Sequence, residues 1–284
     1  MKNSMQLKAF IKNIAKEKNI SAQLVLQNYM LERLLERISV SKYQSNFILK
    51  GGFLIAAIVG LDSRTTMDMD ATLKGLFVTK ELVTQMFNEI CGIQVDDAIE
   101  FYIERIGEIR EEDEYSGFRI SLSAHYPPMV VPLKIDITTG DKITPKEIIY
   151  EYNLLFEDRK IQVLAYNLET VLAEKIETVI SRSDQNTRMR DFYDIYILQK
   201  LQSKNITFSI LKTAILKTSE KRNSIASMKR YSEIILEISN SSIMAQQWLN
   251  YQKDFDYAND ISFKEICHVL KRILDAVEES SNLL

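Results

Sequence analysis

Two aspartates separated by one residue give the chain its clearest chemical signal. Asp68 and Asp70 flank Met69, and side chains along an extended strand alternate between its faces, so both carboxylates are expected on one face. Neighbouring carboxylates repel each other unless a cation or a proton lies between them. Carboxylate oxygens suit Mg²⁺, which usually takes one or two of them together with substrate phosphates. The pair therefore predicts a divalent-metal site, although such pairs also occur on exposed strands without a metal.

A glycine pair precedes these acids. Gly51 and Gly52 open an apolar run from Phe53 to Leu61 that is expected to form a helix. Glycine lets the backbone approach a bulky anion closely, and the free N–H groups at a helix start attract one. A simple turn is the alternative interpretation. With the acidic pair beside it, the stretch predicts a phosphate-binding turn next to a metal site.

A third aspartate lies in a later strand candidate. Asp136 lies between Ile135 and Ile137 in the apolar strand expected at 130–138, on the face opposite to them. An acid costs several kcal/mol if it is buried without a partner. Asp136 is therefore a candidate third carboxylate beside Asp68 and Asp70, and an ordinary strand with one wet face is the alternative.

A lysine lies within an apolar helix stripe. Lys175 is flanked by Leu172 and Ile176 in the predicted helix 168–181, where a lysine is unfavourable unless its ammonium meets an anion or reaches water. We interpret it as a phosphate ligand; a structural salt bridge is the alternative. Asp191 and Asp194 lie one turn apart on the helix that follows.

Hydrophobic periodicity predicts the elements that position these residues. Helices are expected over 5–17, 22–39 and 79–91, with Ser21 and Asn167 as N-caps. Strands are expected over 101–109, 118–124, 130–138 and 160–165, with a hairpin loop at 110–116 and a turn or helix start at 144–147. The remainder reads as helices over 208–219, 224–238, 241–254 and 263–280.

Composition narrows the function classes. The 284 residues are 46% hydrophobic with a net charge of -3, which argues against a general polyanion binder. Two histidines and two distant cysteines argue against histidine triads and zinc sites. No apolar run reaches the roughly 20 residues that span a bilayer, so we expect a soluble, cytoplasmic protein. Lysines and arginines gather in residues 207–230; a solvated face is the usual reason, and RNA contact is the weaker alternative.

Together the segments resemble the nucleotidyltransferase superfamily and, more narrowly, the AbiEii abortive-infection toxins and their mycobacterial relatives, the MenT toxins. Gly52 stands where the superfamily usually has serine. The matching segments, in the family's order, are Lys50-Gly51-Gly52, Arg64-Thr65-Thr66-Met67-Asp68-Met69-Asp70, Lys134-Ile135-Asp136, Ala173-Glu174-Lys175 and Arg190-Asp191-Phe192-Tyr193-Asp194.

The resemblance implies an α+β, bilobed protein. Residues 1–166 would form a nucleotidyltransferase-like lobe with a mixed sheet and flanking helices, and residues 167–284 a helical lobe that contributes Lys175 and Asp191 to the cleft. It also implies a type IV toxin of an abortive-infection, antiviral system, with a separately encoded antitoxin and no stable complex between the two. Known relatives transfer nucleotides to tRNA 3′ ends, whereas AbiEii is associated with GTP.

The implied reaction moves a nucleoside monophosphate from an NTP, GTP or CTP, to tRNA or another RNA acceptor. Asp68, Asp70 and Asp136 would hold two Mg²⁺ or Mn²⁺ ions. Lys175 would neutralise the leaving pyrophosphate. Asp191 would orient the Lys175 side chain or contact the base or ribose of the nucleotide. The further nucleotide-binding candidates are Lys50, Gly51, Gly52, Arg64, Thr65 and Asp194.

Three other interpretations stay open. A GTP sensor that performs no transfer is motivated by the missing serine at Gly52. A glycosyltransferase that uses the acidic pair would explain neither Lys175 nor Asp136. A purely structural helical protein would leave these charged residues without partners.

Overall fold

The computed structural model describes residues 4–109 and 117–280, and the chain divides into two compact units. The first comprises Met1–Asp141 and Ile148–Ala165, and the second comprises Lys142–Glu147 and Tyr166–Leu284. The second unit thus includes a short segment, 142–147, that precedes the boundary expected at residue 166. The hairpin loop expected at 110–116 lies outside the described residues.

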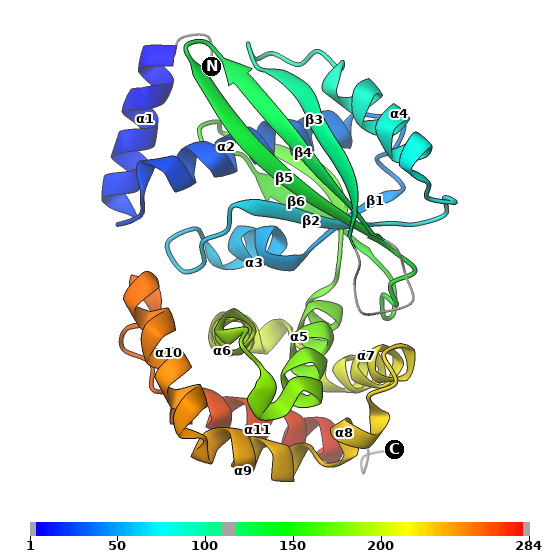
Figure 1. Ribbon diagram of the computed structural model, residues 1–284, viewed down its shortest axis with the longest axis vertical. Helices are drawn as coiled ribbons and strands as arrows, with labels where there is room; N and C mark the ends of the chain where they lie inside the picture. Colours follow the sequence, from blue (N-terminus) through cyan, green and yellow to red (C-terminus); the bar gives the residue numbers. More distant parts are fainter. Residues whose placement is uncertain (1–3, 110–116, 281–284) are drawn as a thin grey trace. The chain divides into compact units, whose positions relative to one another are not determined.

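A seven-stranded mixed sheet forms the first unit, in the order β3-β4-β5-β2-β1-β7-β6 (Figure 1). β2 pairs with β5 and β1 with β7 in parallel, and the other pairs are antiparallel. The predicted mixed sheet with flanking helices is confirmed. The strands are β1 (Phe47–Lys50), β2 (Asp68–Leu73), β3 (Glu100–Ile109), β4 (Gly117–Tyr126), β5 (Met129–Thr139), β6 (Ile148–Asn153) and β7 (Lys160–Ala165).

The sequence prediction contains no strand directly before the glycine pair and none between the turn at 144–147 and the strand at 160–165. It was therefore wrong in omitting β1 and β6. β6 is an edge strand that pairs with β7 alone. Its first residues, Ile148 and Ile149, are both exposed, so the alternation of buried and exposed residues that reveals a half-buried strand is confined to residues 150–153.

Helices cover one face of the sheet. α2 (Ala22–Ser39) packs against β5 and β7, α1 (Ser4–Glu17) against α2, and α4 (Lys80–Cys91) against β3 (Figure 1). The strands bury Met69, Ala71, Ile135 and Ile137 on this side, each large side chain contributing about 1.5–3 kcal/mol. The polar residues that alternate with them must therefore project from the opposite face.

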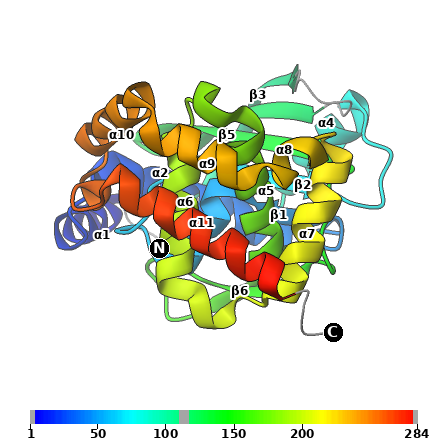
Figure 2. The ribbon, with the colours of Figure 1, turned by 90° about the horizontal axis from the view of Figure 1, so that it is seen from below.

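The second unit is helical. Its helices are α5 (Leu168–Arg182), α6 (Met189–Gln202), α7 (Phe208–Lys221), α8 (Ile225–Lys229), α9 (Tyr231–Asn240), α10 (Ser242–Asp254) and α11 (Phe263–Glu279). α5 packs against α6 and α7, and Figure 2 shows α11 alongside α9. No helix in the two described ranges is long and apolar enough to cross a membrane.

Local sequence signals set several helix starts. The side chains of Ser21 and Asn167 accept hydrogen bonds from the N–H groups of Leu24 and Thr170, as N-caps do. The single helix expected at 224–238 was wrong, because it is broken into α8 and α9. There the Arg230 N–H reaches back only three residues, to the Ser227 carbonyl at 3.0 Å, which closes one helix before the next begins.

Candidate active site

Four neighbouring strands place four charged residues in one line across the sheet. Lys50 on β1 is the register partner of Asp70 on β2, Asp70 is the partner of Asp136 on β5, and Asp136 is the partner of Arg119 on β4. Register partners project from the same face of a sheet. We call these four residues the charged row: a cation, two carboxylates and a second cation.

Asp68 lies beside this row. It precedes Asp70 by two residues on β2, so it projects from the same face, and it is exposed while Asp70 is partly buried. Its register partner on β5 is Lys134. The structure therefore brings Asp68, Asp70 and Asp136 to one face, opposite the face that α2 covers.

Arg119 is the neighbour of these acids that the sequence analysis missed. Its Nε donates to Asp136 Oδ1 at 2.8 Å and its Nη2 to Asp136 Oδ2 at 2.6 Å. The hydrogen bonds and charge of Asp136, with smaller contributions from Asp68 and Asp70, raise the pKa of Arg119. The available signal was a basic residue on the polar face of the strand expected at 118–124.

The turn formed by Gly51 and Gly52 lies in close contact with the Asp70 side chain. Gly51 has a φ of +65°, and a Cβ built on it would lie 2.7 Å from both Cβ and Cγ of Asp70. The N–H of Gly52 donates to Asp70 Oδ2 at 3.3 Å. Gly51 and Gly52 begin α3 (Gly51–Val59), whose first N–H groups have no partners within the helix itself. A metal-bound phosphate is the kind of group that this turn suits.

The polar candidates near this turn have different surroundings. Arg64 is 1% exposed and its guanidinium donates to the Thr65 carbonyl. A Cβ at Gly52 would lie 3.0 Å from Arg64 Nη2 and 3.1 Å from Thr66 Oγ1. A side chain at position 52, where the superfamily usually has serine, would thus be flanked by a guanidinium and a hydroxyl. Lys50, at the end of the charged row, donates to Asp141 at 2.7 Å.

Two buried amides on α2 fix the segment that leads into β2. Asn28 Nδ2 donates to the Thr66 carbonyl at 2.8 Å, and Gln27 Nε2 to the Met67 carbonyl at 3.2 Å. Both side chains are almost fully buried. They hold the backbone immediately before Asp68, and their only sequence signal was polarity within a helix of buried residues.

The carboxylate oxygens of Asp68, Asp70 and Asp136 are suitable ligands for a hard divalent ion. The structure does not, however, assemble them into the predicted three-carboxylate centre. Within residues 4–109 and 117–280, no three acidic, histidine or cysteine side chains converge as a metal centre requires. The reason is visible in the contacts, since Asp136 turns to Arg119 and Asp70 to the Gly52 N–H. Carboxylate oxygens on one face remain the ligand type that Mg²⁺ and Mn²⁺ take, and the three-aspartate site stays a prediction.

In the second unit, Lys175 meets both candidate acids of α6. Its Nζ lies 2.5 Å from Asp191 Oδ1 and 3.0 Å from Asp194 Oδ2. The carboxylates are buried, and the lysine side chain is 18% exposed. The position of Lys175 within an apolar helix stripe is therefore explained, in part, by a buried ion cluster that joins α5 to α6.

Replacing Lys175 by methionine should destabilise the second unit by about 3–5 kcal/mol, because two buried carboxylates would lose their shared cation. Chemical denaturation monitored by the fluorescence of Trp248, which lies in this unit, measures the change. Lys217→Met is the matched control on exposed α7 surface and should change stability by less than about 0.5 kcal/mol. Equal stability of both variants would show that the cluster is not structural.

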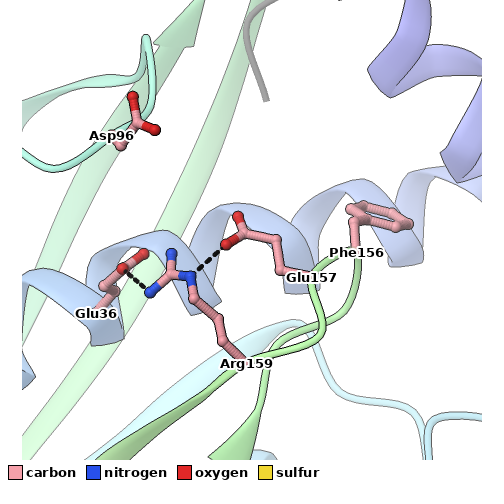
Figure 3. A pocket seen from close by; sticks show the side chains of 5 residues that line it. All are labelled: Glu36, Asp96, Phe156, Glu157 and Arg159. Atoms are coloured by element: carbon pink, nitrogen blue, oxygen red, sulfur yellow. Dashed lines mark hydrogen bonds and ion pairs between the residues drawn. The ribbon is translucent and has the colours of Figure 1, made fainter.

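Figure 3 shows a pocket in the first unit that contains none of the predicted site residues. Its volume is about 380 Å³, and Glu36, Asp96, Phe156, Glu157 and Arg159 line it. Arg159 pairs there with Glu36 at 2.5 Å and also with Glu157. Because Glu36 belongs to α2, the pocket lies on the helix-covered side of the sheet, away from the charged row.

Comparison with solved structures identifies the fold as that of nucleotidyltransferases. A putative nucleotidyltransferase from H. pylori superimposes with a TM-score of 0.56 at 14% identity, over 93% of this chain and 99% of that one. MenT4, a nucleotidyltransferase toxin from Mycobacterium tuberculosis H37Rv, gives 0.53 at 14% identity, over 95% and 98%. Among curated proteins no match is found.

The sequence itself identifies the family. The family model described as "Nucleotidyl transferase AbiEii toxin, Type IV TA system" matches residues 33–272. The protein therefore belongs to the AbiEii nucleotidyltransferase toxin family of type IV toxin–antitoxin systems, as the resemblance implied. Membership implies a separate antitoxin.

Proposed function

We propose that this toxin transfers a nucleoside monophosphate from an NTP to the 3′ end of a tRNA, in abortive defence against phage. The observation that carries the proposal is the shared face of Asp68, Asp70 and Asp136 beside the Gly51–Gly52 turn. GTP and CTP are the first nucleotides to test. The antitoxin would act without forming a stable complex.

In this reaction the acceptor 3′-hydroxyl loses its proton to solvent and its oxygen forms a bond to the α-phosphorus. The bond from that phosphorus to the oxygen bridging the α- and β-phosphates breaks, and pyrophosphate leaves with that oxygen. Asp68 and Asp70 would hold the triphosphate-bound Mg²⁺, and Asp136 would join them around a second ion. Bound divalent ions would supply Lewis-acid stabilisation of the attacking and leaving oxygens. Gly51 and Gly52 would present backbone N–H groups to the phosphates, so that this chain chiefly positions the reactants.

The other candidates have supporting roles in the proposal. Lys175 would neutralise the pyrophosphate, and Asp191 and Asp194 would orient the Lys175 side chain. Arg64, which lies beside Gly52, would contribute positive charge behind the turn. Lys50 and Thr65 would shape the turn itself, because Lys50 is anchored to Asp141 and Thr65 is buried.

Transfer is tested by incubating the purified protein with total tRNA and each α-labelled NTP in turn. We expect label in tRNA with one or two NTPs, its loss in EDTA, and none from the same NTP labelled at the γ-phosphate. Periodate-oxidised tRNA, which lacks the 3′-terminal diol, should accept no label. Equal labelling of oxidised tRNA would contradict transfer to the 3′ end.

A GTP sensor without transfer activity is the second candidate. Two observations favour the sensor. Gly52 has no side-chain hydroxyl to contact a phosphate, and both carboxylate oxygens of Asp136 accept hydrogen bonds from Arg119. Calorimetric GTP binding, together with no label in tRNA, total RNA or protein from any NTP, would support the sensor over the transferase.

A further inference from the structure

The charged row contains a cation that the transfer reaction, as proposed above, does not use. We propose that Arg119 is a triphosphate ligand that exchanges partners. In the nucleotide-free protein it neutralises Asp136, and when a triphosphate binds, its guanidinium moves to the phosphate oxygens and leaves Asp136 free to bind a divalent ion. This inference rests on the proposed function and names a further residue of the same site.

The geometry shows how Arg119 would block metal binding. Its two donors engage both oxygens of Asp136, at 2.8 and 2.6 Å, in the bidentate arrangement that is the strongest for this pair of groups. Asp136 is in register with Asp70, so the ion that would bridge these two carboxylates meets a positive charge already held by one of them. Nucleotide-free protein should therefore bind divalent ions at Asp136 weakly.

The exposure of the pair makes the exchange feasible. The Arg119 side chain is 51% exposed and that of Asp136 is 22% exposed. The bidentate geometry makes this pair stronger than most surface ion pairs, but contact with solvent still weakens it, so a more highly charged anion can displace the carboxylate. A triphosphate carries more negative charge than one carboxylate, and a planar guanidinium matches phosphate oxygens as well as it matches a carboxylate. Triphosphate binding is thus expected to attract Arg119 away from Asp136.

The other end of the charged row behaves differently. Lys50 and Asp141 form a pair whose side chains are only 12% and 9% exposed. Thr138 also donates to the same Asp141 oxygen, at 2.7 Å. This anchored pair lies beside the glycine turn and holds β1 to the end of β5, so we expect Lys50 to keep its partner while Arg119 exchanges.

The consequence is an order of binding. Asp68 and Asp70 would be available to hold a divalent ion when the nucleotide binds, whereas Asp136 would be available only after Arg119 has moved. A protein without nucleotide would then hold its site in a state that resists loading with metal alone.

Two binding measurements on Arg119→Gln test the exchange without any assay of transfer. Mn²⁺ alone, titrated into nucleotide-free protein and followed by the EPR signal of free Mn²⁺, should bind about fivefold more tightly than in the unaltered protein, the equivalent of the ~1 kcal/mol of an exposed ion pair. Inorganic tripolyphosphate in EDTA, followed by calorimetry, should bind about tenfold more weakly, since one charged hydrogen-bonding partner is lost. The Mn²⁺ and tripolyphosphate affinities of Arg119→Lys should each lie between those of the unaltered protein and Arg119→Gln.

The matched control is Arg119→Gln combined with Asp136→Asn, in which the gain in Mn²⁺ affinity should disappear. Thermal melts establish that each variant is folded. If Arg119→Gln leaves either the Mn²⁺ or the tripolyphosphate affinity unchanged, the partner exchange is wrong. Both readouts are independent of transfer, so failure of the tRNA-labelling assay would count against the proposed function and leave this result standing.

Discussion

Replacing Asp70 by asparagine will abolish nucleotidyl transfer and leave the fold intact. Asp70 is the residue on which the turn and the sheet converge, because it accepts from the Gly52 N–H and is the register partner of both Lys50 and Asp136. Asparagine keeps the shape and an oxygen for the Gly52 N–H but removes the charge. Metal-derived stabilisation amounts to several kcal/mol, and each 1.36 kcal/mol is tenfold in rate, so we expect a loss of about 1,000-fold or more.

Initial rates of labelling of tRNA measure this effect, and the melting temperature checks the fold. Asp62→Asn is the matched control, because Asp62 follows α3 and pairs with Lys18 at 3.0 Å rather than with any residue of the charged row. The control should retain full activity. Transfer by Asp70→Asn within tenfold of the unaltered rate would remove Asp70 from the metal site.

Gly51→Ala should lower both stability and activity. A residue other than glycine at positive φ costs roughly 1–2 kcal/mol, and the new methyl group would also displace the Asp70 carboxylate that fills this space. We expect a loss of about 2 kcal/mol in the free energy of unfolding of the first unit and about 100-fold in transfer, because misplacing a reacting group by about 1 Å has effects of that size.

Gly75→Ala separates the two causes. Gly75 also has a positive φ, +76°, but the nearest atom to a Cβ there is Asn46 Nδ2 at 3.7 Å. This control should show backbone strain of about 1 kcal/mol with unaltered transfer rates. If Gly51→Ala were as active as Gly75→Ala, the close approach of the turn to Asp70 would have no part in the reaction.

The fold was predictable where local signals were strong. Alternation identified β4 and β5, and N-capping side chains identified the starts of α2 and α5. β6 was missed because its alternation is short: Ile148 and Ile149 are both exposed, and only residues 150–153 alternate. The break between α8 and α9 at Arg230 likewise comes from a backbone hydrogen bond rather than from a proline or glycine in the sequence.

In the candidate site, too, some features could be predicted from the sequence and others could not. Sequence spacing was enough to place Asp68 and Asp70 on one face, and it marked Lys175 as a residue in need of an anion. What spacing does not contain is strand register, which aligns Arg119 with Asp136 and Lys50 with Asp70. The partners of the acids were therefore unforeseen, although the acids themselves were not.

The central claim is that divalent ions bind at the three aspartates together with a nucleotide. Crystals of the protein grown with Mn²⁺ and a non-hydrolysable analogue of the NTP that labels tRNA would test it through the anomalous scattering of manganese. We predict a peak about 2.1 Å from carboxylate oxygens of Asp68 and Asp70, with Asp136 released from Arg119. Nucleotide bound with manganese at a site that includes none of these aspartates would contradict the account.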